Sequence, residues 1–163
     1  MTEAEKRMHR CCFTGHRPEK MIMIEKQVIK ELEVAIRKAI DDGFNVFVTG
    51  MAPGVDIWAA EIILRLRDKE KLPLKLISTN PHSNFIERWP EWKKRYIAIM
   101  NAADLTRDIC DGYKRGVYQI RNEWMVDHSS RVIAVWNGKP SGTKNTVDYA
   151  NRVNVPVVNV YRT

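Results

Sequence analysis

Three loops of this sequence combine glycine, hydroxyl and basic residues in ways that suit phosphate binding. The first is Thr14-Gly15-His16-Arg17, which follows a short apolar run. Gly15 lets the backbone turn without a Cβ, and the guanidinium fork of Arg17 matches the oxygens of a phosphate. An ordinary turn with a solvated arginine would use the same residues, so this loop alone leaves both interpretations open.

The second loop runs from Gly50 to Asp56 and joins a strand pattern to a helix pattern. Its Gly-x-x-x-Gly turn exposes the first amides of a helix, which attract phosphate. The turn is neither a Gly-x-Gly-x-x-Gly dinucleotide loop nor a Walker loop with its Lys-Ser/Thr pair. Asp56 suits either a ribose hydroxyl or the cap of the helix.

A third loop, Ser141-Gly142-Thr143, opens the last predicted helix and offers amides and hydroxyls together, as does a plain helix cap. Arg121 and Asn122 follow one another in an earlier helix pattern. The segment 81–92 mixes aromatic and polar residues, among them Arg88. It suits a lid that stacks a base, or equally an apolar hinge.

Short apolar runs alternate with helical patterns along the chain. Strands are predicted at 9–14, 44–49, 74–78, 104–109, 131–136 and 156–161, and helices at about 24–40, 55–66, 91–101, 117–127 and 142–152. This alternation predicts an α/β fold: one doubly wound Rossmann-like domain over 1–163, with a mostly parallel six-stranded sheet and helices on both faces. Residues 1–8 are expected to be a flexible N-terminal extension. In such a sheet, ligands bind beyond the carboxyl ends of the strands, where the three loops would meet.

Composition narrows the classes of protein. The 163 residues carry 27 Lys+Arg and 20 Asp+Glu, a net charge of +7, which favours a negatively charged partner. We expect part of this excess to surround the ligand crevice, at Arg17, Lys20, Arg88, Lys114, Arg115, Arg121, Lys139 and Lys144. The basic residues form no block typical of a nucleic-acid arm, so nucleic acid is not expected as a partner.

Other features bear on location and cofactors. No apolar run is long enough to span a bilayer and no signal peptide is recognisable, so a cytoplasmic protein without a membrane partner is expected. Cys11, Cys12 and Cys110 are expected to be reduced, buried thiols. The four histidines match no zinc motif, and neither a metal nor a required cofactor is predicted.

The motifs resemble those of a known family. Thr-Gly-His-Arg-Pro (14–18), Gly-Met-Ala-Pro-Gly-Val-Asp-Ile-Trp-Ala-Ala-Glu (50–61), Arg-Trp (88–89), Arg-Asn-Glu-Trp-Met-Val-Asp (121–127) and Ser-Gly-Thr (141–143) resemble the YpsA-like family. That family belongs to the SLOG superfamily of Rossmann-like domains, with the DprA/Smf proteins and the LOG phosphoribohydrolases. The resemblance covers about residues 9–161.

The resemblance implies a pocket for a nucleotide or an ADP-ribose-like molecule, and possible homodimers. The ligand-binding residues predicted from the motifs and the resemblance together are Thr14, Gly15, His16, Arg17, Gly50, Ala52, Gly54, Asp56, Glu61, Arg88, Arg121, Asn122, Ser141, Gly142 and Thr143. LOG enzymes carry a catalytic glutamate where this chain has Thr146, and a hydroxyl cannot replace that carboxylate. Arg131 is a second departure, at a position where these families often have Asp.

Three functions follow as hypotheses. The first is a module that binds a phosphorylated, nucleotide-type small molecule as sensor, regulator or sequestering protein, with no confident catalytic residue. The second is a LOG-type nucleotide N-glycosidase, in which Asp56, Glu61 or Asp111 would supply the missing carboxylate. The third is DprA-like binding of single-stranded nucleic acid, which the dispersed basic residues do not favour.

Overall fold

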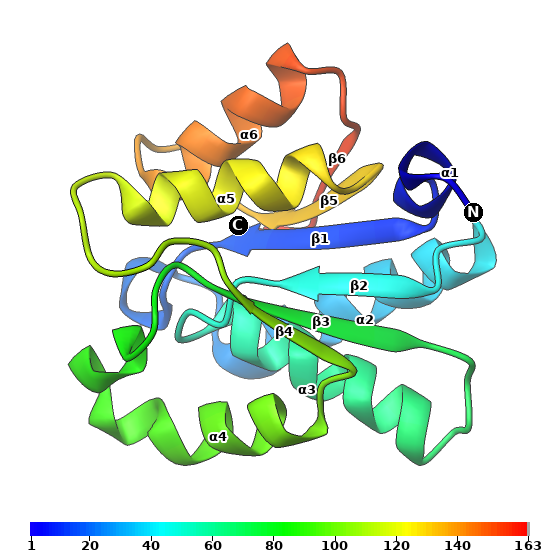
Figure 1. Cartoon of the computed structure of the whole chain (residues 1–163), viewed down its shortest axis with the longest axis horizontal. Helices are drawn as coiled ribbons and strands as arrows, with labels where there is room; N and C mark the ends of the chain where they lie inside the picture. Colours follow the sequence, from blue (N-terminus) through cyan, green and yellow to red (C-terminus); the bar gives the residue numbers. More distant parts are fainter. Residues whose placement is uncertain (163) are drawn as a thin grey trace.

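The computed structural model describes residues 1–162 and is built on one parallel six-stranded sheet (Figure 1). The strands are β1 (Arg10–Gly15), β2 (Val46–Thr49), β3 (Lys75–Asn80), β4 (Leu105–Asp108), β5 (Arg131–Val135) and β6 (Val157–Asn159). Their order in the sheet is β4-β3-β2-β1-β5-β6. The direction of strand addition reverses beside β1, where Cys12 is in register with Val48 of β2 and with Val132 of β5. The predicted doubly wound α/β fold is confirmed.

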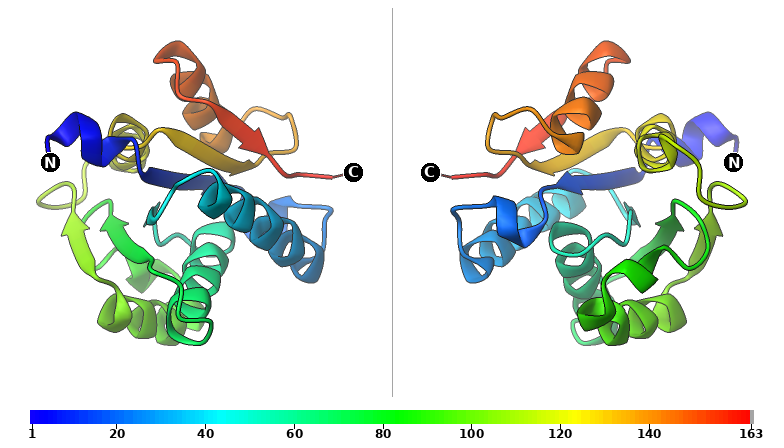
Figure 2. Two further views of the ribbon diagram at one scale, coloured as in Figure 1. Left: turned by 90° about the vertical axis from the view of Figure 1, so that its right-hand side faces the viewer. Right: turned by 90° about the vertical axis from the view of Figure 1, so that its left-hand side faces the viewer.

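Helices cover both faces of this sheet, as the two edge-on views in Figure 2 show. The first layer comprises α2 (Glu25–Asp41), α3 (Val55–Asp68) and α4 (Lys93–Ala102). The second comprises α5 (Val117–Asp127) and α6 (Gly142–Arg152). Because α3 contacts β1, β2 and β3, and α6 contacts β1, β5 and β6, the two layers meet the sheet at offset positions.

The main core lies between the sheet and the first helix layer. One stripe of α2 is buried through Val28, Leu32, Ile36 and Ala39, at the three- and four-residue spacing of an amphipathic helix. From β1, Phe13 faces this core and stacks on Phe47 of β2, with 6.1 Å between ring centroids. The apolar face of each element therefore fixes how the loops at the carboxyl edge are placed.

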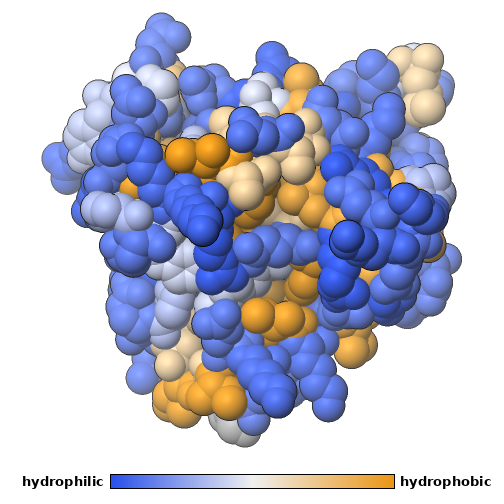
Figure 3. Space-filling model, turned by 90° about the horizontal axis from the view of Figure 1, so that it is seen from below, coloured by the Kyte–Doolittle hydropathy of each residue, from blue (hydrophilic) through white to orange (hydrophobic). Residues whose placement is uncertain are grey.

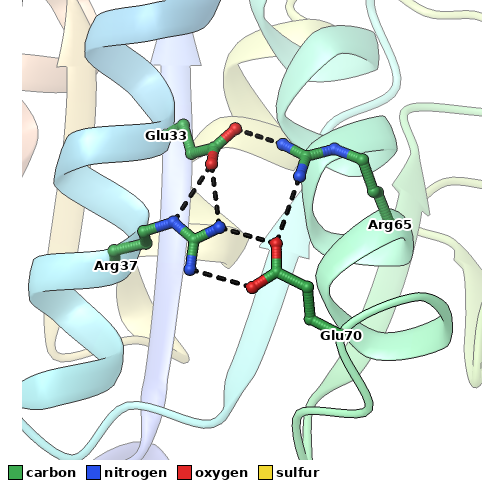
Figure 4. Close-up of polar contacts among 4 residues, drawn as sticks. All are labelled: Glu33, Arg37, Arg65 and Glu70. Atoms are coloured by element: carbon green, nitrogen blue, oxygen red, sulfur yellow. Dashed lines mark hydrogen bonds and ion pairs between the residues drawn. The ribbon is translucent and has the colours of Figure 1, made fainter.

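An ion-pair network joins α2 to α3 on the outer surface (Figure 4). Arg37 Nη2 lies 2.7 Å from Glu70 Oε2 and Arg37 Nε lies 3.0 Å from Glu33 Oε2, while Arg65 contacts both glutamates. Seen from the side of α3 and α4, the surface is mostly hydrophilic, with hydrophobic residues in several separate small areas (Figure 3). The network faces the solvent and holds α2 against α3; it does not belong to the predicted ligand site.

The structure adds elements that the sequence pattern did not predict. Residues Glu3–Arg7 of the expected extension form the short helix α1, capped by Thr2, whose side chain accepts a hydrogen bond from the Glu5 amide. The loop expected at 81–92 contains two 3₁₀ turns, Phe85–Arg88 and Pro90–Trp92, and a third 3₁₀ turn follows β1 at Pro18–Lys20. The last strand is shorter than predicted, because only Val157–Asn159 pair with β5.

Within residues 1–162, no helix combines the length and the apolarity needed to cross a membrane. The same residues contain no group of three or more His, Cys, Asp or Glu side chains placed to hold a metal ion. The three cysteines are free, and Cys11 and Cys12 are buried in β1. Burial raises the pKa of the Cys12 thiol to about 12, so this thiol is protonated at neutral pH.

Candidate functional site

A cavity of about 320 Å³ opens at the carboxyl edge of the sheet, beside the strand-order reversal at β1. The ends of β1 and the loops after β1, β2 and β5 form its walls, together with α5 and the segment before α4. Twelve of the fifteen predicted ligand-binding residues line it: Thr14, Gly15, His16, Arg17, Ala52, Asp56, Arg88, Arg121, Asn122, Ser141, Gly142 and Thr143. The three loops therefore converge on one cavity, as the parallel sheet requires.

The base of the cavity holds a buried carboxylate. Asp56 is only 7 % exposed, and its Oδ2 accepts a hydrogen bond from the Ala52 amide at 3.2 Å. Its other oxygen, Oδ1, is buried without a hydrogen-bond partner among the described residues. Burial raises the pKa of Asp56 to about 6, against the opposing attraction of Arg121. Asp56 therefore binds the backbone of the loop after β2 through Oδ2. It does not cap α3, which was the alternative that its spacing in the sequence allowed.

Arg121 is also buried, at 3 % exposed, and its Nη1 and Nε atoms donate hydrogen bonds within the protein. Its Nη1 donates to the carbonyl of Gly50, and its Nε donates to Asn122 Oδ1 at 2.8 Å. A second carbonyl, that of Thr79, lies 3.4 Å from Nη1. Arg121 was predicted to lie at the phosphate end of the site. It holds the loop after β2 to α5, and it also lines the cavity.

His16 is an acceptor within the wall of the cavity. It is 4 % exposed, and its Nε2 accepts a hydrogen bond from the Asn137 amide at 3.0 Å. Burial lowers the pKa of His16, and the nearby positive charge of Lys20 lowers it further. Both effects favour the neutral ring. The hydrogen bond from the Asn137 amide links the loop after β1 to the loop after β5.

The mouth of the cavity carries two arginines and an indole. The Arg17 guanidinium lies 5.6 Å from the Trp89 ring centroid, and that of Arg88 lies 5.1 Å from it. Arg88 also donates to the Tyr118 hydroxyl at 3.3 Å. Within segment 81–92, Phe85 is buried in the core, while Arg88 and Trp89 line the cavity. Stacking of a base by this segment stays a prediction.

The start of α6 forms the opposite wall. The Ser141 side chain caps the helix by accepting from the Lys144 amide at 3.1 Å. The first amides of a helix have no partner within it, and Gly142 and Thr143 both line the cavity. Thr146, one turn on, is buried and donates its hydroxyl to the Gly142 carbonyl at 3.1 Å, away from the cavity.

Three predicted residues lie outside the lining. Gly50 and Gly54 shape it from behind: Gly54 has φ +94°, and a Cβ there would lie 2.8 Å from Pro18 Cδ. The prediction that Glu61 binds the ligand needs correction. Glu61 points to α4 and pairs with Arg95, with 2.5 Å between Oε1 and Nη2. It is a helix-packing residue.

The charge prediction also needs correction. Of the eight basic residues expected around the crevice, only Arg17, Lys20, Arg88 and Arg121 line it. Lys144 pairs with Asp148 on the outer side of α6. Lys114, Arg115 and Lys139 lie outside the lining as well.

Two lining residues, Phe13 and Tyr118, were not expected near the ligand from the sequence. Lys20 was expected around the crevice and Trp89 lies in the segment considered as a lid, and both line the cavity. Tyr118 lies three and four positions before Arg121 and Asn122, so the helical repeat places it on the same face of α5. That spacing was the available signal. Phe13 carries no such signal, since it reads as an ordinary strand residue.

Known proteins resemble this chain over most of its length. A family model described as "YspA SLOG family" matches residues 11–160. The UPF0398 protein OB1025 of Oceanobacillus iheyensis is 28 % identical over 145 residues, which cover 83 % of this chain and 78 % of that protein. The SPbeta prophage-derived protein YoqJ of Bacillus subtilis is 30 % identical over 149 residues, covering 81 % of this chain and 82 % of YoqJ.

Two solved structures share the fold. DNA processing protein A of Helicobacter pylori, described for its single-stranded DNA binding mode, superposes with a TM-score of 0.64 at 21 % identity and covers 95 % of this chain. DprA of Streptococcus pneumoniae superposes with a TM-score of 0.62 at 17 % identity and covers 89 % of it. This chain spans 66 % of the first and 48 % of the second. By the family model and its relatives, the chain belongs to the YspA SLOG family.

Proposed function

We propose that the cavity binds a phosphorylated, nucleotide-type small molecule such as ADP-ribose, and that the protein acts as a sensor, regulator or sequestering protein for it. The observation that carries the proposal is the pairing of two kinds of group in one cavity. Cationic side chains and helix amides belong to the lining, and so does Asp56, whose buried Oδ1 has no hydrogen-bond partner among residues 1–162.

The donors suit the phosphates of the ligand. Arg17 and Arg88 are charged side chains at the mouth. Within the described part of the chain, Arg17 contacts the Trp89 ring and the exposed carboxylate of Glu19, and Arg88 contacts the Trp89 ring and the Tyr118 hydroxyl. The helix start at Gly142 and Thr143 adds amides with a favourable dipole. A diphosphate placed between these groups would receive charge-assisted hydrogen bonds from both sides of the mouth.

The acceptor suits a sugar. An unpaired buried oxygen is costly, and a donor from a ligand would remove that cost. The hydroxyls of a ribose are such donors, and they stand next to the phosphates in every nucleotide. Asp56 would therefore accept a hydrogen bond from the ribose, while Arg17 and Arg88 at the mouth bind the phosphates.

Isothermal titration with ADP-ribose tests the proposal. We expect binding, and we expect Arg17→Ala and Arg88→Ala each to weaken it by about tenfold. Lys69→Ala, at the far end of α3, is the matched control and should leave the affinity unchanged. The proposal fails if ADP-ribose, NAD and simple nucleotides all show no binding at about 1 mM ligand.

Two further measurements separate the other functions. Release of free base from a nucleotide panel, lost in Asp56→Asn, would show an N-glycosidase instead. Oligonucleotide binding that weakens steeply with salt and is insensitive to Arg17→Ala would show a nucleic-acid protein, as described for the Helicobacter pylori relative of this fold.

A further inference from the structure

A second groove, of about 650 Å³, lies at the other end of the sheet from the ligand cavity. The starts of β1 to β4 and the helix α1 border it. Its floor is aliphatic and comes from neighbouring strands, through Val46, Ile77 and Leu105. Nothing in the proposed function uses this groove.

Among residues 1–162, no helix lies over the starts of β2 and β3 on this face of the sheet. Along β3, Leu76 belongs to the core under α3, whereas Ile77 packs toward the other layer. In that layer, α5 contacts β1 and β3, and α6 contacts β1, β5 and β6. Figure 1 looks onto this face, with α5 and α1 above the strands and no helix in front of β2 and β3.

The bare region is apolar in a fold whose sheets are normally covered on both faces. Parallel sheets bury both sides because helices pack on each of them. Here all four residues of the edge strand β4 are exposed, and Leu105 is 50 % exposed. The aliphatic floor is thus a surface that a further helix would complete.

The charge of the groove selects the kind of helix. Lys6 and Lys75 line it and are exposed, and neither has an ion-pair partner within residues 1–162. The one carboxylate in the lining, Asp104, is already paired with Arg67 at 2.9 Å. Arg10 is paired with Glu3, at 2.5 Å. The free charge around the floor is therefore positive.

We infer that this groove docks an acidic amphipathic helix of a partner protein, with the aliphatic stripe of the helix on Val46, Ile77 and Leu105 and its carboxylates toward Lys6 and Lys75. Single-stranded nucleic acid fits less well, because the lining contains no Phe, Tyr or Trp on which bases could stack. A second copy also fits less well, because the exposed Val34 on α2 is surrounded by Lys30 and Arg37. The neighbouring carboxylate of Glu33 is already paired with Arg37 and Arg65.

A designed peptide tests the inference. The probe is a fluorescein-labelled helix of about 15 residues, with a leucine stripe flanked by glutamates, and its partner peptide has lysine at each glutamate. Fluorescence anisotropy measures binding to the whole chain. We expect the acidic peptide to bind and the lysine peptide to bind at least about tenfold more weakly.

Variants then locate the binding. Lys6→Glu with Lys75→Glu, and separately Leu105→Asp, should each weaken the acidic peptide by about tenfold or more. Lys26→Glu with Lys30→Glu changes the net charge by the same amount on the other helix layer, and should change the affinity by less than about twofold. Leu105→Ala repeats the apolar test if Leu105→Asp lowers the helical circular dichroism signal.

Several outcomes would overturn the inference: equal weakening by both lysine pairs, equal binding of the lysine peptide, or no binding of the acidic peptide at about 1 mM. A thymidine oligonucleotide that binds and is lost with Lys6→Glu/Lys75→Glu, while the peptide does not bind, would assign the groove to nucleic acid. Self-association in sedimentation velocity that Leu105→Asp abolishes would assign it to a second copy. ADP-ribose affinity should be the same in all these variants.

Discussion

The carboxylate of Asp56 and the guanidinium of Arg121 both lie against Gly50: a Cβ on that residue would lie 2.8 Å from Asp56 Oδ2 and 2.9 Å from Arg121 Cζ. Both side chains are buried, and they come from different helices, α3 and α5. The position after β2 therefore needs a residue without a side chain so that the two charges can lie close together beneath the ligand cavity.

Gly50→Ala should lower the free energy of unfolding, because the added methyl group must displace one of the two buried charges. We expect a loss of about 1–3 kcal/mol, the usual cost of overpacking, measured by urea unfolding. Gly112→Ala is the control, since nothing lies within 4 Å of a Cβ there, and it should stay within about 0.5 kcal/mol of the wild type. Equal effects of the two substitutions would contradict the close approach at Gly50.

The raised pKa of Asp56 makes stability depend on pH in a defined direction. Burial raises this pKa from 3.8 to about 6, so the folded protein holds the proton more tightly than the unfolded chain does. The contribution is fully present below pH 4 and is lost as the pH rises through about 6. The difference corresponds to roughly 3 kcal/mol, at 1.36 kcal/mol for each pH unit.

Asp56→Asn removes this ionisation, so urea unfolding of both proteins between pH 4 and pH 7 isolates it. We expect the stability of the wild type to fall relative to the variant over that range. A constant difference between the two proteins would mean that the Asp56 carboxyl titrates alike in the folded and unfolded states.

The sequence predicted the site loops well because their placement follows from the sheet. Once the strands are parallel, the loops that contain Arg17, Asp56 and Ser141 must lie at one edge, whatever the details of packing. The apolar runs predict the strands, and their alternation with helices predicts that the strands are parallel. Position at the edge is therefore readable from the sequence.

The roles of individual side chains were less readable. Glu61 lies five residues after Asp56, which turns it by about 140° around α3 and directs it to Arg95 instead of the cavity. Arg121 was expected at the phosphate end, yet it binds the carbonyl of Gly50, a contact that spans 71 residues of sequence. Such partners depend on tertiary packing, and one sequence carries no local signal for them.

His16 should be important for stability through its acceptor nitrogen. His16→Ala removes the acceptor of the half-buried Asn137 amide, and we expect it to lower the unfolding free energy by about 1 kcal/mol in urea. His16→Gln keeps an acceptor in the side chain and should recover part of the loss. No recovery would point to the packing of the ring instead of its hydrogen bond.

The stability of the protein should also depend on the protonation of His16 at acid pH. NMR of the imidazole protons measures the pKa of this residue, and urea unfolding measures the stability. Burial lowers the pKa of His16 below its ordinary 6.5, so its contribution to stability is present above pH 6.5 and is lost as the pH falls through the folded pKa. His16→Gln lacks this titration, and its stability should fall less than that of the wild type on acidification.

The last prediction separates the two carboxylates that the motif places in one stretch. Asp56→Asn removes the charge of a side chain that lines the cavity and replaces one acceptor oxygen with an NH₂ donor. We expect ADP-ribose binding to weaken by about tenfold. Glu61→Gln breaks an ion pair with Arg95 outside the cavity and should change the affinity by less than about twofold. Isothermal titration of both variants at one pH and one salt concentration gives the comparison. If Glu61→Gln weakened binding as much as Asp56→Asn, the ligand would have to reach α4, and the cavity described above would not be the whole site.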